Sequence, residues 1–448
     1  MKQLNKPTVL VLIFLAVLIV YFNSKNITQF DSKWYIPTAL SIIREGNVDL
    51  NEYMLVSEDD YRIARINGKF YLKQQSIGQS LIIALPLVFT ADKGLNLVFS
   101  LFPRWKEYVK QRMSGRLGCA PSNVINYIIL SLRFELFIAS LIVALTAVFI
   151  YLIANLFLNR GYSLLVTFIF AFCTSAWSTV SRSLWQHGPS MLMLAITLYL
   201  ILLAKNNPRL IQFTGVSLAL SYAIRPTNIL SVLLLTVFVL TQYLRYSLRY
   251  FLWMALVAVP FTVYNFIIYH SFLPQHDISM IFLNRKDDFW IALAGNVVSP
   301  ARGLFIYSPI ILFSIAGLIL KLKNRQLVKL DYFLCAIILL QWIMMSFIYE
   351  WWGGHSFGPR YFSDMLPYFI YFLIPVVVTM PRLKGIKKTV VVSIFSICTI
   401  FSFFVHYRGA TAADVYLWNS QPNNINFNSS RLWDWSDIQF LRGVRLRR

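Results

Sequence analysis

A single aspartate near the N-terminus has surroundings that suit proton transfer. Asp31 lies in the segment 29–35 (Q-F-D-S-K-W-Y), a few residues after an apolar run over 7–22. If that run crosses a membrane, the carboxylate lies at the hydrocarbon boundary, where partial desolvation makes it a better proton acceptor toward a hydroxyl. Asp31 is therefore a candidate general base. The alternative, which the local sequence alone favours, is a helix N-cap at the start of the amphipathic stretch 35–44.

Cations that suit a phosphate group lie in two other segments. Lys73 lies within 67–79 (N-G-K-F-Y-L-K-Q-Q-S-I-G-Q), just before an expected helix start, where free backbone N–H groups add to its charge. Arg225 precedes Pro226 and Thr227 at the end of an apolar run. The structural alternatives are a lysine that snorkels from a membrane-surface helix and an arginine that caps or snorkels from a helix end.

Three further short segments combine aromatic and ionisable residues. In the segment 182–189, the tryptophan itself is ordinary because tryptophan is common at membrane interfaces. The Gln, His and Arg beside it in a seven-residue connection are less ordinary. Glycine lets a backbone approach a ligand, tryptophan faces suit sugar rings or prenyl chains, and arginine suits phosphate. The segments are 182–189 (R-S-L-W-Q-H-G-P), 299–305 (S-P-A-R-G-L-F) and 349–361 (Y-E-W-W-G-G-H-S-F-G-P-R-Y). The candidate side chains in them are Trp185, Gln186, His187, Arg302, Glu350, Trp351, Trp352, His355 and Arg360.

The composition determines what kind of protein must position these residues. Of the 448 residues, 57% are hydrophobic and 13% are charged, against about 25% charged in soluble domains. This excludes a soluble enzyme, a disordered protein and a disulfide-stapled secreted module. The net charge of +22, from 41 Lys and Arg against 19 Asp and Glu, is explained by basic cytoplasmic loops, so no nucleic-acid partner is expected.

Apolar runs predict an all-α polytopic membrane protein with about eleven transmembrane helices. A bilayer-crossing helix needs about 20 mostly apolar residues. The candidate spans are 7–22, 134–158, 163–180, 188–204, 210–224, 228–243, 250–268, 303–320, 330–348, 362–380 and 389–406. A further run over 76–91 is short and interrupted by Gly78, Gln79 and Pro86, and we interpret it as a re-entrant or interface-lying helix.

The basic residues orient these spans. With the N-terminus inside and 76–91 not spanning, the short cytoplasmic connections collect most of the cations near the span ends, as the positive-inside rule requires. Those cations are Arg160, Lys205, Arg209, Arg245, Arg249, Lys321, Lys323, Arg325, Lys329, Arg382, Lys384, Lys387 and Lys388. The basic stretch 92–122 favours the opposite orientation, but it belongs to the long outer loop, and long loops largely escape the rule. Asp31, Glu350 and the other candidate site residues then lie at the extracytoplasmic face.

Two regions lie outside the predicted membrane domain. The domain covers 1–406 and includes a long first outer loop over 23–132, and an extracytoplasmic tail covers 407–448. The first apolar run is not followed by a cleavage site, since N-S-K-N comes next, so we interpret it as a retained anchor. The sequence contains no Walker loop, G-x-S-x-G, H-E-x-x-H or paired C-x-x-C motif.

The pattern of motifs resembles the GT-C superfamily of integral-membrane glycosyltransferases. It is most similar to the bacterial branch related to protein O-mannosyltransferases and lipid A aminoarabinose transferases. Short matches run over most of the chain: 31–49 (D-S-K-W-Y to E-G-N-V-D), 68–78 (G-K-F-Y-L-K-Q-Q-S-I-G), 185–189 (W-Q-H-G-P), 225–227 (R-P-T), 299–309 (S-P-A-R-G-L-F-I-Y-S-P), 351–360 (W-W-G-G-H-S-F-G-P-R) and 431–442 (R-L-W-D-W-S-D-I-Q-F-L-R).

The resemblance implies a reaction and roles for the candidate residues. It implies inverting transfer of a sugar from a polyprenyl-phosphate donor to a glycan, lipid or protein hydroxyl at the outer face of the cell membrane. Asp31 becomes the expected base rather than a cap, Lys73 the expected cation near the lipid phosphate, and Arg225, Arg302 and Arg360 further candidates for that phosphate.

Two departures and two rival functions remain open. Related transferases often have Lys-Pro-Pro where this chain has Lys73-Gln74-Gln75, and two successive acids where it has Asp31-Ser32. No cofactor is implied with certainty, and a requirement for a divalent metal stays open. The rivals are a lipid-linked polysaccharide polymerase or ligase and a non-enzymatic lipid or sugar flippase.

Overall fold

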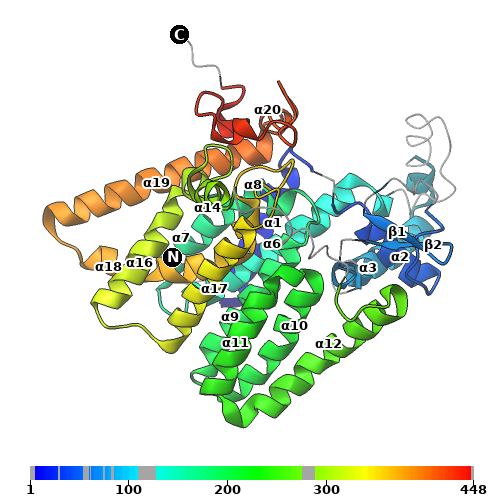
Figure 1. Ribbon diagram of the computed structural model, residues 1–448, viewed down its shortest axis with the longest axis horizontal. Coiled ribbons are helices and arrows are strands. Elements are labelled where there is room, and N and C mark those ends of the chain that lie inside the picture. Colours follow the sequence, from blue (N-terminus) through cyan, green and yellow to red (C-terminus); the bar gives the residue numbers. More distant parts are fainter. Residues whose placement is uncertain are drawn as a thin grey trace.

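The protein is a bundle of helices with one small hairpin (Figure 1). The computed structural model describes residues 6–28, 31–53, 60, 62–73, 76–81, 85–108, 128–274 and 288–444. Its elements are α1 (Lys6–Asn23), α2 (Tyr35–Arg44), β1 (Ile63–Ile66), β2 (Lys69–Leu72), α3 (Leu85–Leu101), α6 (Leu132–Ala154), α7 (Arg160–Phe172), α8 (Ser175–Ser178), α9 (His187–Ala204), α10 (Thr214–Ile224), α11 (Ile229–Gln242), α12 (Ser247–Tyr269), α14 (Phe289–Val298), α15 (Leu304–Tyr307), α16 (Leu312–Lys323), α17 (Lys329–Ser346), α18 (Leu366–Thr379), α19 (Gly385–Thr411) and α20 (Asp414–Leu417).

Six of these helical segments, among the described residues, are long and apolar enough to cross a bilayer. They contain α6, α9, α12, α17, α18 and α19, and a seventh span results if the bent segments 160–172 and 175–182 count as one. Apolar runs become helices in lipid because a helix satisfies every backbone N–H and C=O within itself. The prediction of a helical, multi-pass membrane protein is confirmed.

The span count of eleven is not confirmed by helix length, and two predicted spans are interrupted. The run 163–180 divides into α7 and α8, with a 41° bend. The run 303–320 divides at Pro309, whose missing N–H prevents α15 from continuing into α16. The helices α1, α10 and α11 match predicted spans in position, but the apolar helix in α1, Pro7–Asn23, falls just short of a span, and α10 and α11 have only 11 and 14 residues.

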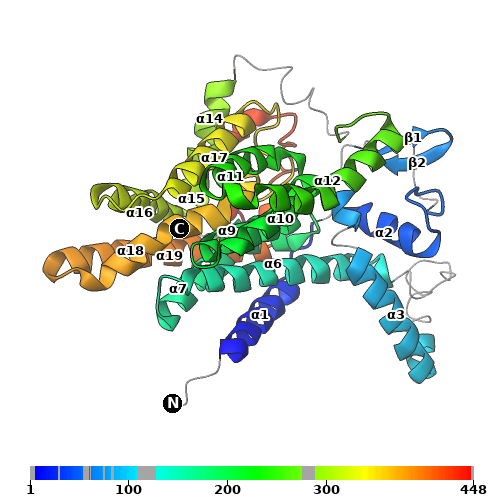
Figure 2. The same ribbon diagram turned by 90° about the horizontal axis from the view of Figure 1, so that it is seen from below.

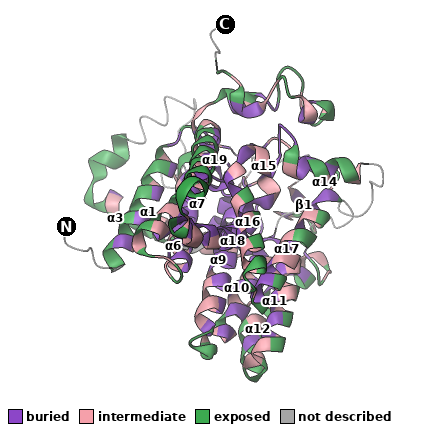
Figure 3. Cartoon of the chain, turned by 90° about the vertical axis from the view of Figure 1, so that its left-hand side faces the viewer, coloured by how far each residue is buried: buried purple, intermediate pink, exposed green. Residues whose placement is uncertain are grey.

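Central and peripheral helices differ in burial (Figure 3). In their apolar windows, 83% of the α18 segment and 72% of α9 are buried, against 22% of α19 and 11% of the α12 segment. On α12 the exposed side chains include Leu252, Leu256 and Val263, a surface suited to lipid. The ends of the central helices α9 and α18 are therefore the places where buried polar groups can be held rigidly.

Within the predicted first outer loop, α2, α3 and the hairpin lie beside the bundle in both Figure 1 and Figure 2. Strands β1 and β2 pair antiparallel, with Ile63 opposite Leu72 and Ile66 opposite Lys69. Asn67 and Gly68 in the turn have φ of 50° and 80°, the left-handed pair that a tight two-residue hairpin needs. The sequence analysis missed this hairpin, although Asn-Gly is its usual signal.

The predicted helix over 76–91 has different boundaries in the structure. Within it, residues 78–81 form a short helical turn that packs against the bundle, and α3 extends from Leu85 to Leu101, ten residues beyond the predicted end. Residues 82–84 lie outside the described residues. At the other end of the chain, α19 continues to Thr411, so the predicted boundary between 406 and 407 falls within a helix.

Candidate functional site

Asp31 contacts Arg360, which the sequence places at the opposite end of the chain. The Arg360 Nη2 donates to the Asp31 Oδ2 at 2.5 Å. Asp31 lies in the turn between α1 and α2, and Arg360 is the first residue of the 3₁₀ helix η7 (Arg360–Met365) that leads into α18. The N-cap of α2 is Trp34, without a side-chain cap bond. Asp31 is therefore not the N-cap of that helix, and its partner is a cation from another element.

The contact continues inward through His187, Arg225 and Asp364. The Arg360 Nε donates to the His187 Nε2 at 3.1 Å, and the Arg225 Nη1 lies 2.7 Å from the His187 Nδ1. Arg225 forms an ion pair with Asp364, whose carboxylate also lies 3.4 Å from His187. His187 begins α9, Arg225 follows α10 and Asp364 lies in η7. The structure thus brings together four of the predicted site residues, and Asp31 is one of them.

Exposure is lower in the inner part of this chain of contacts, which we call the Asp31–Asp364 relay, than in its outer part. The side chains of Asp31 and Arg360 are 32% and 18% exposed, whereas those of Arg225 and Asp364 are 6% and 0% exposed. Two carboxylates balance two guanidinium groups, as buried charges require. Burial together with the nearby Arg360 charge lowers the pKa of Arg225 to about 9. Asp31 is therefore the exposed end of the relay.

Asp364 was not a predicted site residue. It is fully buried, and its acid group is the counter-charge for Arg225. Asp364 lies four residues after Arg360 in the 3₁₀ helix η7. No local signal in the sequence identified it, because its role depends on Arg225, which comes to it from another element.

Trp185 and Gln186 hold the outer part of the relay in place. The Arg360 guanidinium lies over the Trp185 ring, 4.2 Å from its centroid, an arrangement that orients the planar cation. Gln186 hydrogen bonds to the Tyr35 hydroxyl of α2. The backbone N–H of Leu184 donates to the buried Glu135 carboxylate at 2.9 Å. These contacts tie the 184–187 segment to α6 and to α2, the helix that follows Asp31.

A second buried arginine fixes the chain that leads to Asp31. The Arg182 side chain is 0% exposed, and it donates to the carbonyl oxygens of Tyr21 at 2.6 Å, Ser24 at 3.3 Å and Asn26 at 3.4 Å. Carbonyl groups at a helix C-terminus have no partners within the helix. Arg182 satisfies them at the end of α1 and so sets where the chain leaves that helix.

Glu350 and His355 lie on the loop before Arg360. The charges of Arg360, Asp31 and His355 all act on the Glu350 carboxyl, and burial is the main cause that raises its pKa above the ordinary 4.5. The His355 Nε2 lies 2.9 Å from the Asn424 Oδ1 in the tail. Glu350 is thus near the exposed end of the relay, whereas the recorded partner of His355 belongs to the tail.

Lys73 lies on an exposed segment that is anchored to the same region. It follows β2, and its side chain is exposed. Three residues later, the Ser76 hydroxyl donates to the Ala223 carbonyl, two residues before Arg225. The Gln79 amide donates to the Leu184 carbonyl, next to Trp185. Three residues of chain span at most about 11 Å, so Lys73 lies in the neighbourhood of the relay.

Arg302 has a different environment from the other predicted phosphate ligands. It is 2% exposed, and its guanidinium donates to the carbonyls of Trp352, Ala301 and Gly354 and to the side chains of Gln439 and Asn419. Burial lowers its pKa to about 10. All these acceptors belong to the protein, so Arg302 joins the 349–361 loop to the tail.

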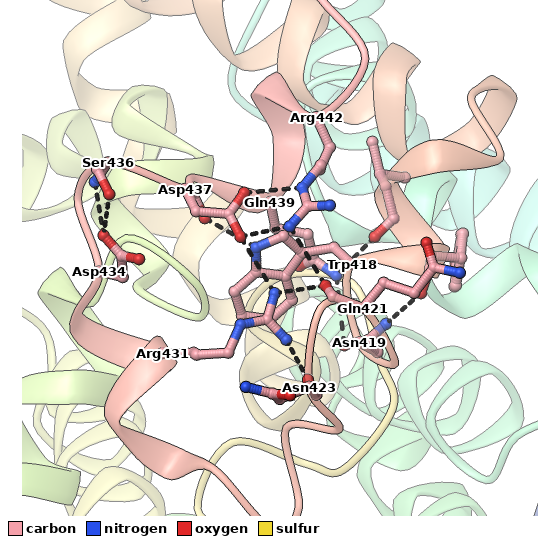
Figure 4. A network of polar contacts seen from close by, with 12 residues as sticks. Trp418, Asn419, Gln421, Asn423, Arg431, Asp434, Ser436, Asp437, Gln439 and Arg442 are labelled. Atoms are coloured by element: carbon pink, nitrogen blue, oxygen red, sulfur yellow. Dashed lines mark hydrogen bonds and ion pairs between the residues drawn. The ribbon is translucent and has the colours of Figure 1, made fainter.

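Gln439 is the centre of this tail contact. Its Oε1 accepts from Arg302, from the Tyr307 hydroxyl and from the Gly358 N–H, and its Nε2 donates to the Ser356 and Val415 carbonyls. Figure 4 shows how the neighbouring tail is itself ordered, with Arg431 and Arg442 directed at Asp437. The tail thereby supports the loop that carries Glu350 and Arg360.

The two tryptophans of the loop are buried rather than exposed. Trp351 and Trp352 are each 3% exposed and belong to an apolar cluster with Trp418, Ile425 and Leu432 of the tail. A Cβ on Gly295 of α14 would overlap the Trp351 ring. Their predicted role as sugar platforms stays a prediction, and their burial favours a packing role.

A metal site was left open by the sequence. Among the described residues, no three His, Cys, Asp or Glu side chains are grouped so that they could hold a metal ion.

Comparison with known proteins identifies no family. No protein-family model and no curated protein sequence matches the chain. Among solved structures, the chain is similar to the crystal structure of ArnT from Cupriavidus metallidurans bound to undecaprenyl phosphate. The two are 11% identical, the match covers 92% of this chain and 70% of that one, and the TM-score is 0.49. A likeness at this level does not identify the reaction.

Proposed function

We propose that the protein is an inverting glycosyltransferase that uses a polyprenyl-phosphate sugar. The acceptor is a hydroxyl of a glycan, lipid or protein, and the reaction takes place at the extracytoplasmic face of the cell membrane. The observation that carries the proposal is the contact of a partly exposed carboxylate, Asp31, with a partly exposed guanidinium, Arg360, at the exposed end of a buried polar relay. The motif resemblance to membrane glycosyltransferases supports the same assignment.

The chemistry requires one base and one phosphate-binding cation. The acceptor oxygen attacks the anomeric carbon while the bond from that carbon to the phosphate oxygen breaks, and a single displacement of this kind inverts the configuration. The acceptor proton goes to Asp31, and the electron pair leaves with polyprenyl phosphate. General-base help of this kind contributes about 10²–10⁴-fold, and a cation at the leaving phosphate stabilises the negative charge in a low-dielectric site.

The ion pair between Asp31 and Arg360 suggests how the donor activates the base. A carboxylate bound to a guanidinium accepts a proton less readily than a free one. A donor phosphate that binds Arg360 would compete with Asp31 for the same N–H groups. We infer that donor binding shifts Arg360 from the carboxylate to the phosphate and leaves Asp31 free to accept the acceptor proton.

The remaining predicted site residues divide into two groups in this proposal. Exposed Lys73 is a second ligand of the donor phosphate, and Glu350 and His355 contact the sugar or the acceptor. Arg225 and His187 hold Arg360 in place through the relay. Arg302 is buried and donates to the loop and to the tail, so it positions the loop.

The two rival functions make different predictions. A polymerase or ligase differs from a transferase in its product, and a flippase differs in the site that it needs. A lipid-linked polysaccharide polymerase or ligase would act on a lipid-linked glycan instead of a monosaccharide donor. A flippase needs a path between the two faces, yet the middle of α9 and α18 is filled by Met191, Leu194, Leu198, Ile370 and Leu373, each 0% exposed. The packed core favours a site that works at one face.

Sugar analysis of the cell envelope tests the proposal. A deletion strain carrying the wild-type gene should contain one sugar that is missing from the same strain carrying Asp31→Asn, with equal amounts of protein in the membrane. Asp434→Asn, which changes an acid of the tail outside the relay, is the matched control and should restore the sugar. Shortened glycan chains would favour the polymerase, and full restoration by Asp31→Asn would contradict the role of Asp31.

A further inference from the structure

A large cavity lies at the opposite ends of the helices that hold the relay. Its volume is about 1110 Å³, and its lining includes the last residues of α9 and α18 and the first residues of α17. The relay contains the first residue of α9 and the segment before α18. Since α9 has 18 residues, the two places are about 27 Å apart at the usual rise per residue. That is roughly the thickness of a bilayer's hydrocarbon core.

The charges of this cavity are all of one sign. Its lining includes Lys205, Lys321, Lys329 and Arg382 and no acidic residue. Lys321 is paired with the buried Asp331 at 2.6 Å and donates to the Tyr371 hydroxyl at 3.1 Å. For the other three cations no ion pair is recorded among the described residues, and all three are exposed. The mouth of the cavity therefore presents three uncompensated positive charges.

The walls of the cavity are apolar. They include Phe157 at the end of α6, Leu202 of α9, Phe238 of α11 and Ile374 and Val378 of α18. Cytoplasmic cations that only orient a membrane protein need no cavity. Other lysines of the same predicted cytoplasmic connections do not line the cavity, namely Lys323, Lys384 and Lys387. A cavity with apolar walls and a cationic mouth, at the level of a membrane surface, suits an amphiphile with an anionic head.

We propose that this cavity binds the phosphate headgroup of an anionic phospholipid from the cytoplasmic leaflet. Lys205, Lys329 and Arg382 contact the phosphate, and the acyl chains lie against the apolar wall of α9 and α18. A soluble anion would gain from the charges but not from the wall, and a zwitterionic lipid would gain from the wall but less from the charges. This site is separate from the Asp31–Asp364 relay and does not depend on the transferase proposal.

Lipid binding to the purified full-length protein tests this assignment. Native mass spectrometry during titration measures affinity for three probes: phosphatidylglycerol, phosphatidylcholine with the same chains, and glycerol phosphate, which has no chains. Phosphatidylglycerol should bind most tightly, and glycerol phosphate should not displace it at equal concentration. Displacement by glycerol phosphate would overturn the lipid assignment in favour of a soluble-anion site, and equal binding of phosphatidylcholine would overturn the role of the cations.

Two variants and a matched control locate the binding. Each lysine or arginine near an anionic headgroup contributes about fivefold in affinity, so Lys205→Glu/Lys329→Glu/Arg382→Glu should weaken phosphatidylglycerol binding roughly hundredfold. Lys323→Glu/Lys384→Glu/Lys387→Glu changes the net charge equally on the same face and should bind as the wild type does. Equal loss in both triple variants would reduce the site to general surface attraction and overturn the proposal.

The second variant fills the cavity without altering any charge. Leu202→Trp adds bulk to the apolar wall and should weaken phosphatidylglycerol binding while all four cations remain. Wild-type binding by Leu202→Trp would overturn the placement of the lipid in the cavity. Thermal unfolding in detergent serves as the folding control for both variants, and each should melt within a few degrees of the wild type because the substituted residues line the cavity at the helix ends.

Discussion

Arg360 and Asp31 are 329 residues apart in the sequence, and the Arg360 Nη2 lies 2.5 Å from the Asp31 Oδ2. This contact joins the segment after α1 to the segment before α18, and it places a base next to a cation at the exposed end of a buried polar relay. The two side chains are opposite in charge and bind each other. A substrate group that binds one of them must therefore compete with the other. The first two predictions follow from that competition.

Asp31→Asn should stop sugar transfer but not weaken binding of the lipid product. Asparagine cannot accept the acceptor proton, whereas the loss of the carboxylate frees Arg360 for a phosphate. Binding of polyprenyl phosphate to the purified variant, measured by native mass spectrometry, should be as tight as in the wild type or tighter. Clearly weaker binding would show that Asp31 itself helps to hold the lipid.

Arg360→Lys should lower kcat/KM for the donor by roughly 10²-fold, the usual effect of removing one stabilising donor at a reacting phosphate. Lysine keeps the charge but loses the planar group that spans Asp31, His187 and the Trp185 ring. Initial rates in membranes at varied donor concentration measure the effect. Arg245→Lys, at an exposed site, is the control, and equal rates in the two variants would contradict the role of Arg360.

Asp364→Asn should destabilise the protein by about 3–5 kcal/mol, because it leaves Arg225 as an uncompensated buried charge. The double variant Arg225→Met/Asp364→Leu removes both charges and should recover much of that loss. Thermal unfolding in detergent compares the three proteins. If the double variant is as unstable as the single one, the two residues do not act as a pair.

Gln439→Ala should lower the stability of the loop that carries Arg360. The substitution removes partners of Arg302, Tyr307 and Gly358 in a buried site, and each buried polar group left unsatisfied costs about 1–3 kcal/mol. Hydrogen exchange of 349–361 should rise in this variant. Gln421→Ala, whose side chain is exposed in the same tail, should leave that exchange unchanged.

Glu350 should make stability fall as the pH rises. Its pKa in the folded protein is raised above 4.5, chiefly by burial, so the folded protein holds this proton more tightly than the unfolded chain. Stability is therefore lost as the pH rises from about 4.5 through the raised pKa. Glu350→Gln cannot ionise and should melt at a higher temperature than the wild type at pH 7, with the difference disappearing below pH 4.5. An unchanged difference across that range would contradict this account.

Local sequence patterns predicted several features of the fold and some of the site. The α9 and α17 helices begin and end within two residues of the predicted spans. The Asn67-Gly68 turn was available as a hairpin signal but was overlooked, and Pro309 could have indicated the break before α16. Lys73, Arg225 and Arg360 were identified by residue type, but their type did not distinguish an exposed cation from one already paired.

The sequence by itself determined that this chain is a helical membrane protein, because in lipid an apolar run must satisfy its own backbone hydrogen bonds. That requirement acts within each segment and can be recognised locally. Which side chains meet was decided by the tertiary structure. Asp364 pairs with Arg225, and Arg302 donates to Gln439 of the tail, because segments that are distant in the sequence pack together. A contact between residues hundreds of positions apart depends on packing and burial, which no local pattern contains.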